Sequence, residues 1–142
     1  KDYKGWTADI FWEQPTSAGT FTASGAVVRL DTGKVHWGLS PDPNLPQTTD
    51  MEGYYVKAGY LLPSKIGPGR VQIFGRYERS EYNLPTGYRD QDWASVGAHY
   101  LIDGQLLKVS FEAADVKFDK QNPTDASQRD YRQYTLGLQF IF

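Results

Sequence analysis

A serine and a histidine lie close together in the sequence and could in principle transfer a proton. Ser95 and His99 are four residues apart. In an extended strand they would share one face but lie about 13 Å apart, too far for the direct hydrogen bond between a serine nucleophile and its base. The other histidine, His36, belongs to no HExxH motif, and the chain has no GxSxG motif and no phosphate-binding glycine loop. We therefore predict that the protein is not an enzyme and has no catalytic residue, metal site or cofactor.

Charged residues offer a different chemistry, because several of them alternate with apolar neighbours. Cations placed this way on the wet face of a strand would set up a field that favours anions in a narrow pore. Mixed signs are also typical of a cross-strand network that keeps a wet surface rigid, and both interpretations stay open. The candidate pore-lining residues are Asp9, Lys57, Arg76, Glu78, His99, Lys108 and Glu112.

The elements that would position these residues are β-strands. Apolar and polar residues alternate through nearly the whole chain, and no segment keeps a helical period for three turns. We predict an all-β fold with about seven antiparallel transmembrane strands in a meander. Most of the strands exceed the length of about 5–6 residues usual in globular proteins and suit the length of about 9–11 that crosses a bilayer. The predicted strands are Lys4–Glu13, Gly19–Leu30, Glu52–Leu62, Arg70–Tyr82, Gln91–Ile102, Gln105–Asp119 and Asp130–Phe142.

One face of each predicted strand is apolar, and aromatic residues stand at both ends of several apolar stripes. The bracketing pairs are Trp6 and Trp12, Tyr54 and Tyr60, and Tyr134 and Phe140. A two-sheet sandwich would show the same alternation, but its core would hold the bulky side chains in the middle of each stripe. Rings at two levels are typical of strands that cross a membrane. In the sixth strand the apolar phase changes after Ala114, where we expect a β-bulge.

The composition of the chain limits its partners and the kind of membrane segment it can form. The 142 residues carry a net charge of −2, which gives no reason to expect binding to nucleic acid. The chain has no cysteine, and no apolar run approaches the ~18 residues of a spanning helix. Aromatic residues make up 15% of the chain, which is high for a domain of this size and fits the bracketed stripes.

The lengths of the connections predict the orientation of the strands. Connections 31–50, 83–90 and 119–129 are long, and they alternate with the shorter 14–19, 63–69 and Asp103-Gly104. Outer-membrane barrels have short periplasmic turns and longer external loops, so this pattern puts residue 1 on the external side. A complete single-chain barrel has an even number of strands. We therefore expect residues 1–142 to be the C-terminal portion of a larger barrel, without a separate soluble domain.

Three arginines lie near the predicted outer mouth, Arg79, Arg89 and Arg132. From position alone, they could attract anions or bind the phosphates of lipopolysaccharide. The lipids of the outer membrane are the expected surroundings of the apolar stripes.

The segment YTLGLQFIF, residues 134–142, resembles the terminal recognition signal of bacterial outer-membrane proteins, which the barrel-assembly machinery reads. The alternating residues of this signal are Tyr134, Leu136, Leu138, Phe140 and Phe142. Residues 53–83, together with the segments KGWTADIFWE and GTFTASGAVVRL, resemble strand pairs of the phosphate-selective porins O and P. This resemblance implies a channel of about 16–18 strands, often a homotrimer, with an anion preference carried by Lys and Arg in the lumen. The constriction loop of such a porin would lie outside this chain, which leaves phosphate selectivity open.

The leading hypothesis is a porin of the bacterial outer membrane, through which small hydrophilic solutes, expected to be anions, diffuse passively. Steric sieving and the field of the lumen would select the solutes. The alternative is a barrel that serves as a sheath or scaffold and encloses a partner, such as a periplasmic electron carrier. A soluble β-sandwich that binds a ligand is a third hypothesis, and purification without detergent would support it.

Overall fold

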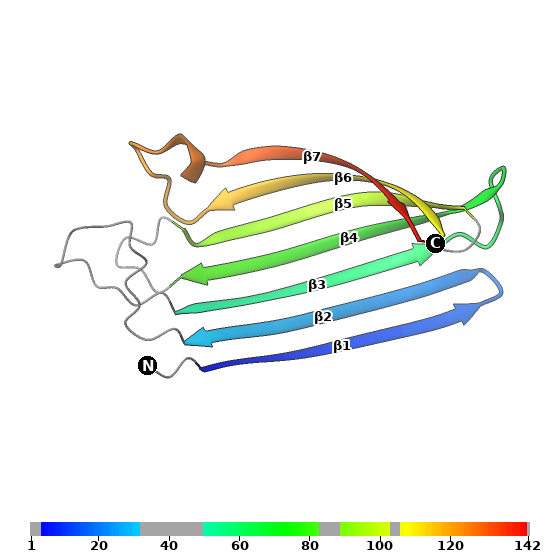
Figure 1. The fold of residues 1–142 in the computed structure, drawn as a ribbon, viewed down its shortest axis with the longest axis horizontal. Coiled ribbons are helices and arrows are strands. Elements are labelled where there is room, and N and C mark those ends of the chain that lie inside the picture. The colour runs from blue at the N-terminus through cyan, green and yellow to red at the C-terminus, as the bar shows by residue number, and fades with distance from the viewer. Residues whose placement is uncertain (1–3, 32–49, 83–88, 103–105, 142) are drawn as a thin grey trace.

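The computed structural model describes residues 4–31, 50–82, 89–102 and 106–141. They form one antiparallel sheet in the order β1-β2-β3-β4-β5-β6-β7, in which each strand pairs with the next along the chain (Figure 1). The elements are β1 (Lys4–Thr16), β2 (Gly19–Asp31), β3 (Met51–Leu61), β4 (Gly69–Tyr82), β5 (Gln91–Ile102), β6 (Leu107–Phe118), the 3₁₀ helix η1 (Ala126–Gln128) and β7 (Tyr131–Phe140). The predicted all-β meander of seven strands is confirmed.

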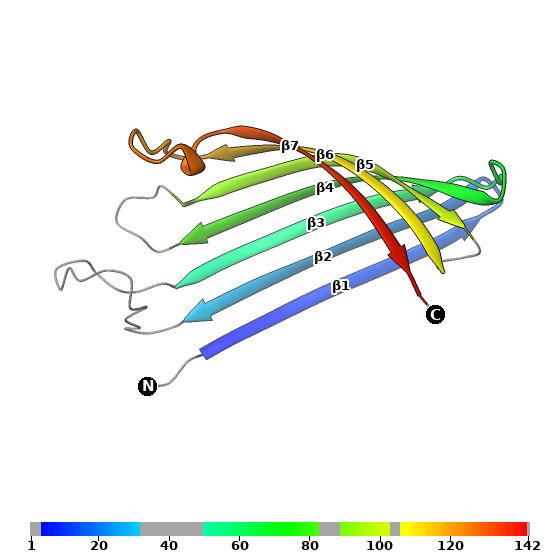
Figure 2. The same ribbon diagram turned by 45° about the horizontal axis from the view of Figure 1, so that its top comes forward.

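The sheet is curved and open. Its edges are β1 and β7, which do not pair with each other (Figure 2), so the arrangement is that of a partial barrel. No second sheet packs on either face within the described residues, unlike the sandwich considered as an alternative. The same part of the chain contains no helix long and apolar enough to cross a membrane.

Strand boundaries differ little from the predicted ones. The first hairpin is tighter than expected, because Thr16 pairs with Gly19 and only Ser17 and Ala18 remain as the turn. The predicted two-residue turn Asp103-Gly104 lies outside the described residues, as does Phe142.

The predicted bulge in β6 is wrong. The strand keeps a regular register with β5 from Leu107 to Phe118, with Val116 opposite Trp93. Val116 is 1% exposed and points to the same face as Glu112. At this end of β6 the apolar residues Val116 and Phe118 lie on the concave face and the charged residues Asp115 and Lys117 on the convex face, while the register stays regular.

Curvature decides which side chains are buried. Side chains converge on the concave face of a curved sheet and spread apart on the convex face. Within the described residues, the buried side chains other than glycine all share one face, which we take as the concave one, and they are Phe74, Ser80, Ser95, Ala114 and Val116. Large apolar side chains on the other face stay exposed, such as Val96 at 67% and Leu136 at 77%.

The aromatic residues of the convex face shift steadily along the sheet. Trp12, the lower ring of the stripe on β1, lies in the same cross-strand row as Tyr134, the upper ring of the stripe on β7. Between β1 and β7 the aromatic stripe is therefore displaced along the strands by six residues, the distance from Trp6 to Trp12. Six steps from strand to strand separate β1 from β7, so the displacement is one residue per strand. One residue of rise per strand spacing corresponds to a tilt of about 35°. Transmembrane barrel strands tilt by about 35–45°, so the rings form two level girdles only if the strands are tilted as in such a barrel.

Two of the lower rings also fasten the turns beneath them. The Tyr60 hydroxyl donates a hydrogen bond to the carbonyl of Ala18 in the β1–β2 turn. The Tyr100 hydroxyl donates to the Ile66 carbonyl at 2.6 Å and accepts from the Gly69 amide at 3.1 Å. Each ring packs where only glycine fits, because a Cβ on Gly69 would lie 2.8 Å from the Tyr100 ring. The same device thus ties the β1–β2 hairpin to β3 and the β3–β4 hairpin to β5.

Candidate functional site

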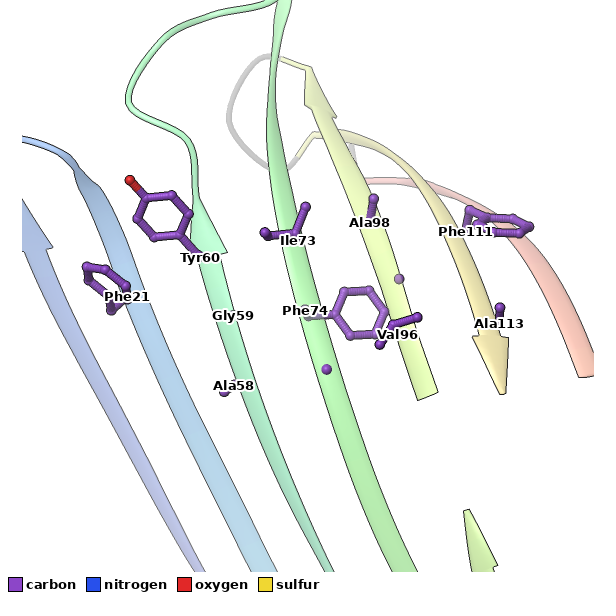
Figure 3. Close-up of a pocket in the computed structure, with 12 residues that line it drawn as sticks. Phe21, Ala58, Gly59, Tyr60, Ile73, Phe74, Val96, Ala98, Phe111 and Ala113 are labelled. Carbon is purple, nitrogen blue, oxygen red and sulfur yellow. The ribbon is translucent and has the colours of Figure 1, made fainter. Parts of the chain in front are cut away.

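Within the described residues, the middle of the convex face carries no charged side chain. Figure 3 shows a shallow apolar hollow there, with Phe21 and Tyr60 on one side and Phe111 on the other. Small residues, among them Ala58 and Ala98, form its floor. The charged candidates therefore have to act from the other face of the sheet.

The structure places all seven predicted pore-lining residues on the concave face. Lys57 stands opposite Arg76 across β3 and β4, and the other five share this face through the continuous register of the sheet. This geometry meets the requirement for residues that line a common space. Their role in a pore stays a prediction. They are Asp9, Lys57, Arg76, Glu78, His99, Lys108 and Glu112.

Phe74 is the centre of the concave wall. Its side chain reaches from β4 toward β5 (Figure 3) and is only 7% exposed. It covers Gly97, where a Cβ would lie 2.5 Å from the end of the Phe74 ring. The Lys57 ammonium lies 4.3 Å from the ring centroid, and the His99 imidazole stacks on the ring at 4.4 Å with an interplanar angle of 18°. A cation near an aromatic face is attracted by the ring quadrupole without losing its net charge.

Two hydroxyl groups hold the neighbouring titratable side chains. The Ser95 hydroxyl donates to the Glu112 carboxylate at 2.6 Å, and Ser110 Oγ lies 2.8 Å from His99 Nδ1. Ser95 and His99, which the sequence suggested as a possible pair, each bond to a residue on β6 instead. Each side chain therefore finds its hydrogen-bond partner across the sheet, and the separation of Ser95 and His99 along β5 does not prevent these bonds.

A second cation of the wall also lies against a ring. The Arg76 guanidinium carbon is 5.5 Å from the centroid of the Trp93 ring, and an Arg76 nitrogen is 3.2 Å from the Glu78 carboxylate. Arg76 and Lys57 are like charges in directly opposed positions, an arrangement that repels. The Phe74 ring holds Lys57 without a carboxylate, whereas Arg76 is held by both the Trp93 ring and Glu78.

Within the described residues, no three His, Asp or Glu side chains are arranged to hold a metal ion. The chemistry that the wall offers is therefore that of fixed charges, hydroxyl groups and ring faces.

Comparison with known proteins places the chain in a family. A family model described as "Phosphate-selective porin O and P" matches residues 16–142. The chain belongs to this family. A curated protein of Aquifex aeolicus (strain VF5), described only as an uncharacterized protein, is 24% identical over 141 residues, which cover 96% of this chain and 29% of that protein. The chain thus spans less than a third of the length of this relative, and no solved structure gives a significant match.

The family match confirms the resemblance drawn from the strand segments. Porins are β-barrel proteins of the outer membrane and form a class of channels, not of enzymes. The seven-stranded meander of this porin chain, with one apolar and one polar face, agrees with that class.

The outer arginines of this porin chain are placed differently from the cations of the concave wall. Arg79 lies on the convex face and binds three carboxylates, those of Glu81 at 2.8 Å, Asp92 at 3.0 Å and Asp119 at 2.6 Å. Arg132 lies on the same face and pairs with Asp115 at 2.7 Å.

These ion pairs neutralise both arginines at the end of the sheet where the long connections lie. The hydrogen bond from Arg79 holds the pKa of the Asp119 carboxyl below its usual value. Arg89 is exposed and lies just before β5. Their predicted role toward anions or lipid phosphates stays a prediction.

The sequence did not reveal the residues that organise the wall. Phe74 and Trp93 were not among the candidate residues, because an aromatic residue on a wet strand face carries no recognisable motif. Phe74 faces a glycine, and Trp93 lies beside a cation, each on the neighbouring strand. These neighbours can be recognised only when the register of the strands is known.

Proposed function

We propose that this chain forms part of the wall of a water-filled channel in the bacterial outer membrane, through which small hydrophilic solutes diffuse. The convex face would contact lipid and the concave face would line the water. The observation that carries the proposal is the tilt of about 35° obtained when the aromatic residues of the convex face are made level. A soluble sheet has no reason to keep its rings at two levels of a flat slab.

The two open edges support a larger closed barrel. The free N–H and C=O groups of β1 and β7 would cost several kcal/mol each in lipid without partners. Strands other than the seven described here would pair with these edges. The Aquifex relative, of which this chain matches 29%, has the length for them.

Anions are the expected solutes because the wall presents cations that carboxylates do not fully cancel. Lys57 and Arg76 lie side by side on aromatic rings. Within the described residues, Lys57 and Lys108 belong to no salt bridge, whereas Arg79 and Arg132 on the convex face are paired. Such a local positive field raises the concentration of anions in a narrow passage.

Planar-bilayer recordings on the full-length protein that carries this chain test the proposal. We expect open current steps that grow with salt concentration, and a reversal potential in a KCl gradient that shows chloride to be more permeant than potassium. A folded, closed barrel that gives no steps would contradict the channel. If such a silent barrel copurified with a partner, the sheath alternative would be favoured.

A further inference from the structure

We infer that Phe74 is a positioning residue, which keeps the Lys57 ammonium apart from the Glu112 carboxylate so that Lys57 remains an unpaired cation in the wall. This inference rests on the proposed channel. Within the described residues, neither Lys57 nor Glu112 takes part in a salt bridge. Both side chains nevertheless lie on the concave face of the sheet.

The register shows what separates the two charges. Phe74 faces Gly97 across β4 and β5, and Gly97 faces Glu112 across β5 and β6. The Phe74 ring covers Gly97 and holds the Lys57 ammonium 4.3 Å from its centroid. The ring therefore occupies the space that Lys57 would cross to reach the carboxylate.

Each charge is also held on its own side. Lys57 gains the electrostatic attraction of the ring, which contributes no counter-charge. Glu112 accepts a hydrogen bond of 2.6 Å from Ser95, whose burial at 7% exposure fixes the hydroxyl. An ammonium on a flexible four-carbon stem could otherwise turn toward a carboxylate of the same face.

Repulsion from Arg76 adds to this tendency. Arg76 stands directly opposite Lys57, and like charges in this position repel. Without the ring, the Lys57 ammonium would be pushed away from Arg76 and drawn to Glu112. The resulting ion pair would remove one of the two adjacent positive charges from the wall.

The test measures the chloride-to-potassium permeability ratio of the full-length protein in planar bilayers. Phe74→Leu keeps an apolar side chain above Gly97 but removes the aromatic face. We expect the ratio to fall to the level given by Lys57→Gln. We expect no fall when Phe74→Leu is made in the Lys57→Gln or the Glu112→Gln background, because one partner of the new ion pair is then missing.

A second variant avoids any disturbance of the ring. Ser95→Ala releases Glu112 from its hydrogen bond while the ring stays in place, so we expect at most a smaller fall of the ratio than with Phe74→Leu. A fall as large as that of Phe74→Leu would overturn the inference, because the hydrogen bond and not the ring would then keep the two charges apart. Folding of each variant is checked by the shift in electrophoretic mobility of the closed barrel on heating.

A fall that persists in the Glu112→Gln background would overturn the inference, since Phe74 would then act only through the structure of the wall. An unchanged ratio in Phe74→Leu would also overturn it, while the conducting wild type would leave the channel proposal intact. A folded wild type without current steps would overturn both.

Discussion

The tilt of the sheet makes a sharp prediction about the cost of placing a charge on its convex face. Trp12, Ala58, Val96 and Tyr134 lie in one cross-strand row. If the strands ran straight across the membrane, all four residues would lie at the same depth. With a shift of one residue per strand, Trp12 lies at the lower ring level and Tyr134 at the upper one. Ala58 and Val96 then fall on either side of the midplane.

The depths follow from the spacing of the rings. Ala58 is two residues from Tyr60 and four from Tyr54, which puts it one residue, or about 3 Å, from the middle of the stripe. Val96 is four residues from Tyr100 and lies equally far beyond the middle. An arginine facing lipid costs about 2–4 kcal/mol at the midplane and about 0–1 kcal/mol near the interfaces. We therefore expect Ala58→Arg and Val96→Arg to destabilise the barrel by about 2–3 kcal/mol more than Trp12→Arg and Tyr134→Arg.

The assay is reversible urea unfolding of the full-length protein in lipid vesicles, followed by tryptophan fluorescence. Leucine at each of the four positions is the matched control, because the difference between arginine and leucine removes the effect of the lost side chain. Equal costs along the row would refute the tilt. A cost greatest at Trp12 and Tyr134 would refute the membrane orientation of the convex face.

Three further substitutions test the contacts that hold the sheet together. Tyr100→Phe removes both hydrogen bonds of its hydroxyl group and should lower the free energy of unfolding by about 1–3 kcal/mol, measured by the same urea assay. Gly97→Ala would place a Cβ 2.4 Å from the Phe111 carbonyl oxygen and 2.5 Å from the Phe74 ring and should cost about 1–3 kcal/mol through overpacking; a neutral effect in urea would show that Gly97 is not packed as tightly as these two contacts require. Asp119→Asn removes one carboxylate from Arg79 and should destabilise by at most about 1 kcal/mol at neutral pH, since the ion pair is partly exposed. Because Arg79 lowers the pKa of Asp119, this contribution is present above the ordinary carboxyl pKa and is lost as pH falls through the lowered value. Wild type and Asp119→Asn should therefore converge in urea titrations at strongly acid pH, and a constant difference would argue against the ion pair.

Much of the fold could be predicted because a strand repeats every two residues and hairpins fix their own register. Stripes such as Trp6 to Trp12 specify which face is apolar, and all seven strands are present close to their predicted limits. The prediction failed at Val116, where apolar residues change faces. The sequence shows such a change as a slip of phase, although the register stays regular. The physical cause is the crowding of the concave face next to Trp93, combined with charges on the convex face at the same level.

The candidate site could be predicted as a face but not as a set of contacts. Alternation was enough to place Lys57 and Arg76 on one side of the sheet. It could not show that they oppose each other, because that depends on the register of β3 against β4. The ring that separates Lys57 from Glu112 depends on three pairings at once and on the absence of a side chain at Gly97.

The balance of charges on the concave face explains why position matters more than number. The seven predicted pore-lining residues include three cations and three carboxylates, so that their sum gives no preference for anions. A preference requires that opposite charges stay apart along the wall. Opposite charges on one wet face pair where they can reach each other, as Arg76 and Glu78 do at 3.2 Å, whereas the Phe74 ring holds Lys57 and the buried Ser95 holds Glu112. On the convex face no such separation is needed, and Arg79 and Arg132 bind carboxylates directly. In the proposed channel, Lys57, which a ring holds without a carboxylate, would keep a net charge that can act on a solute, whereas the cations paired with carboxylates would mainly fasten the sheet.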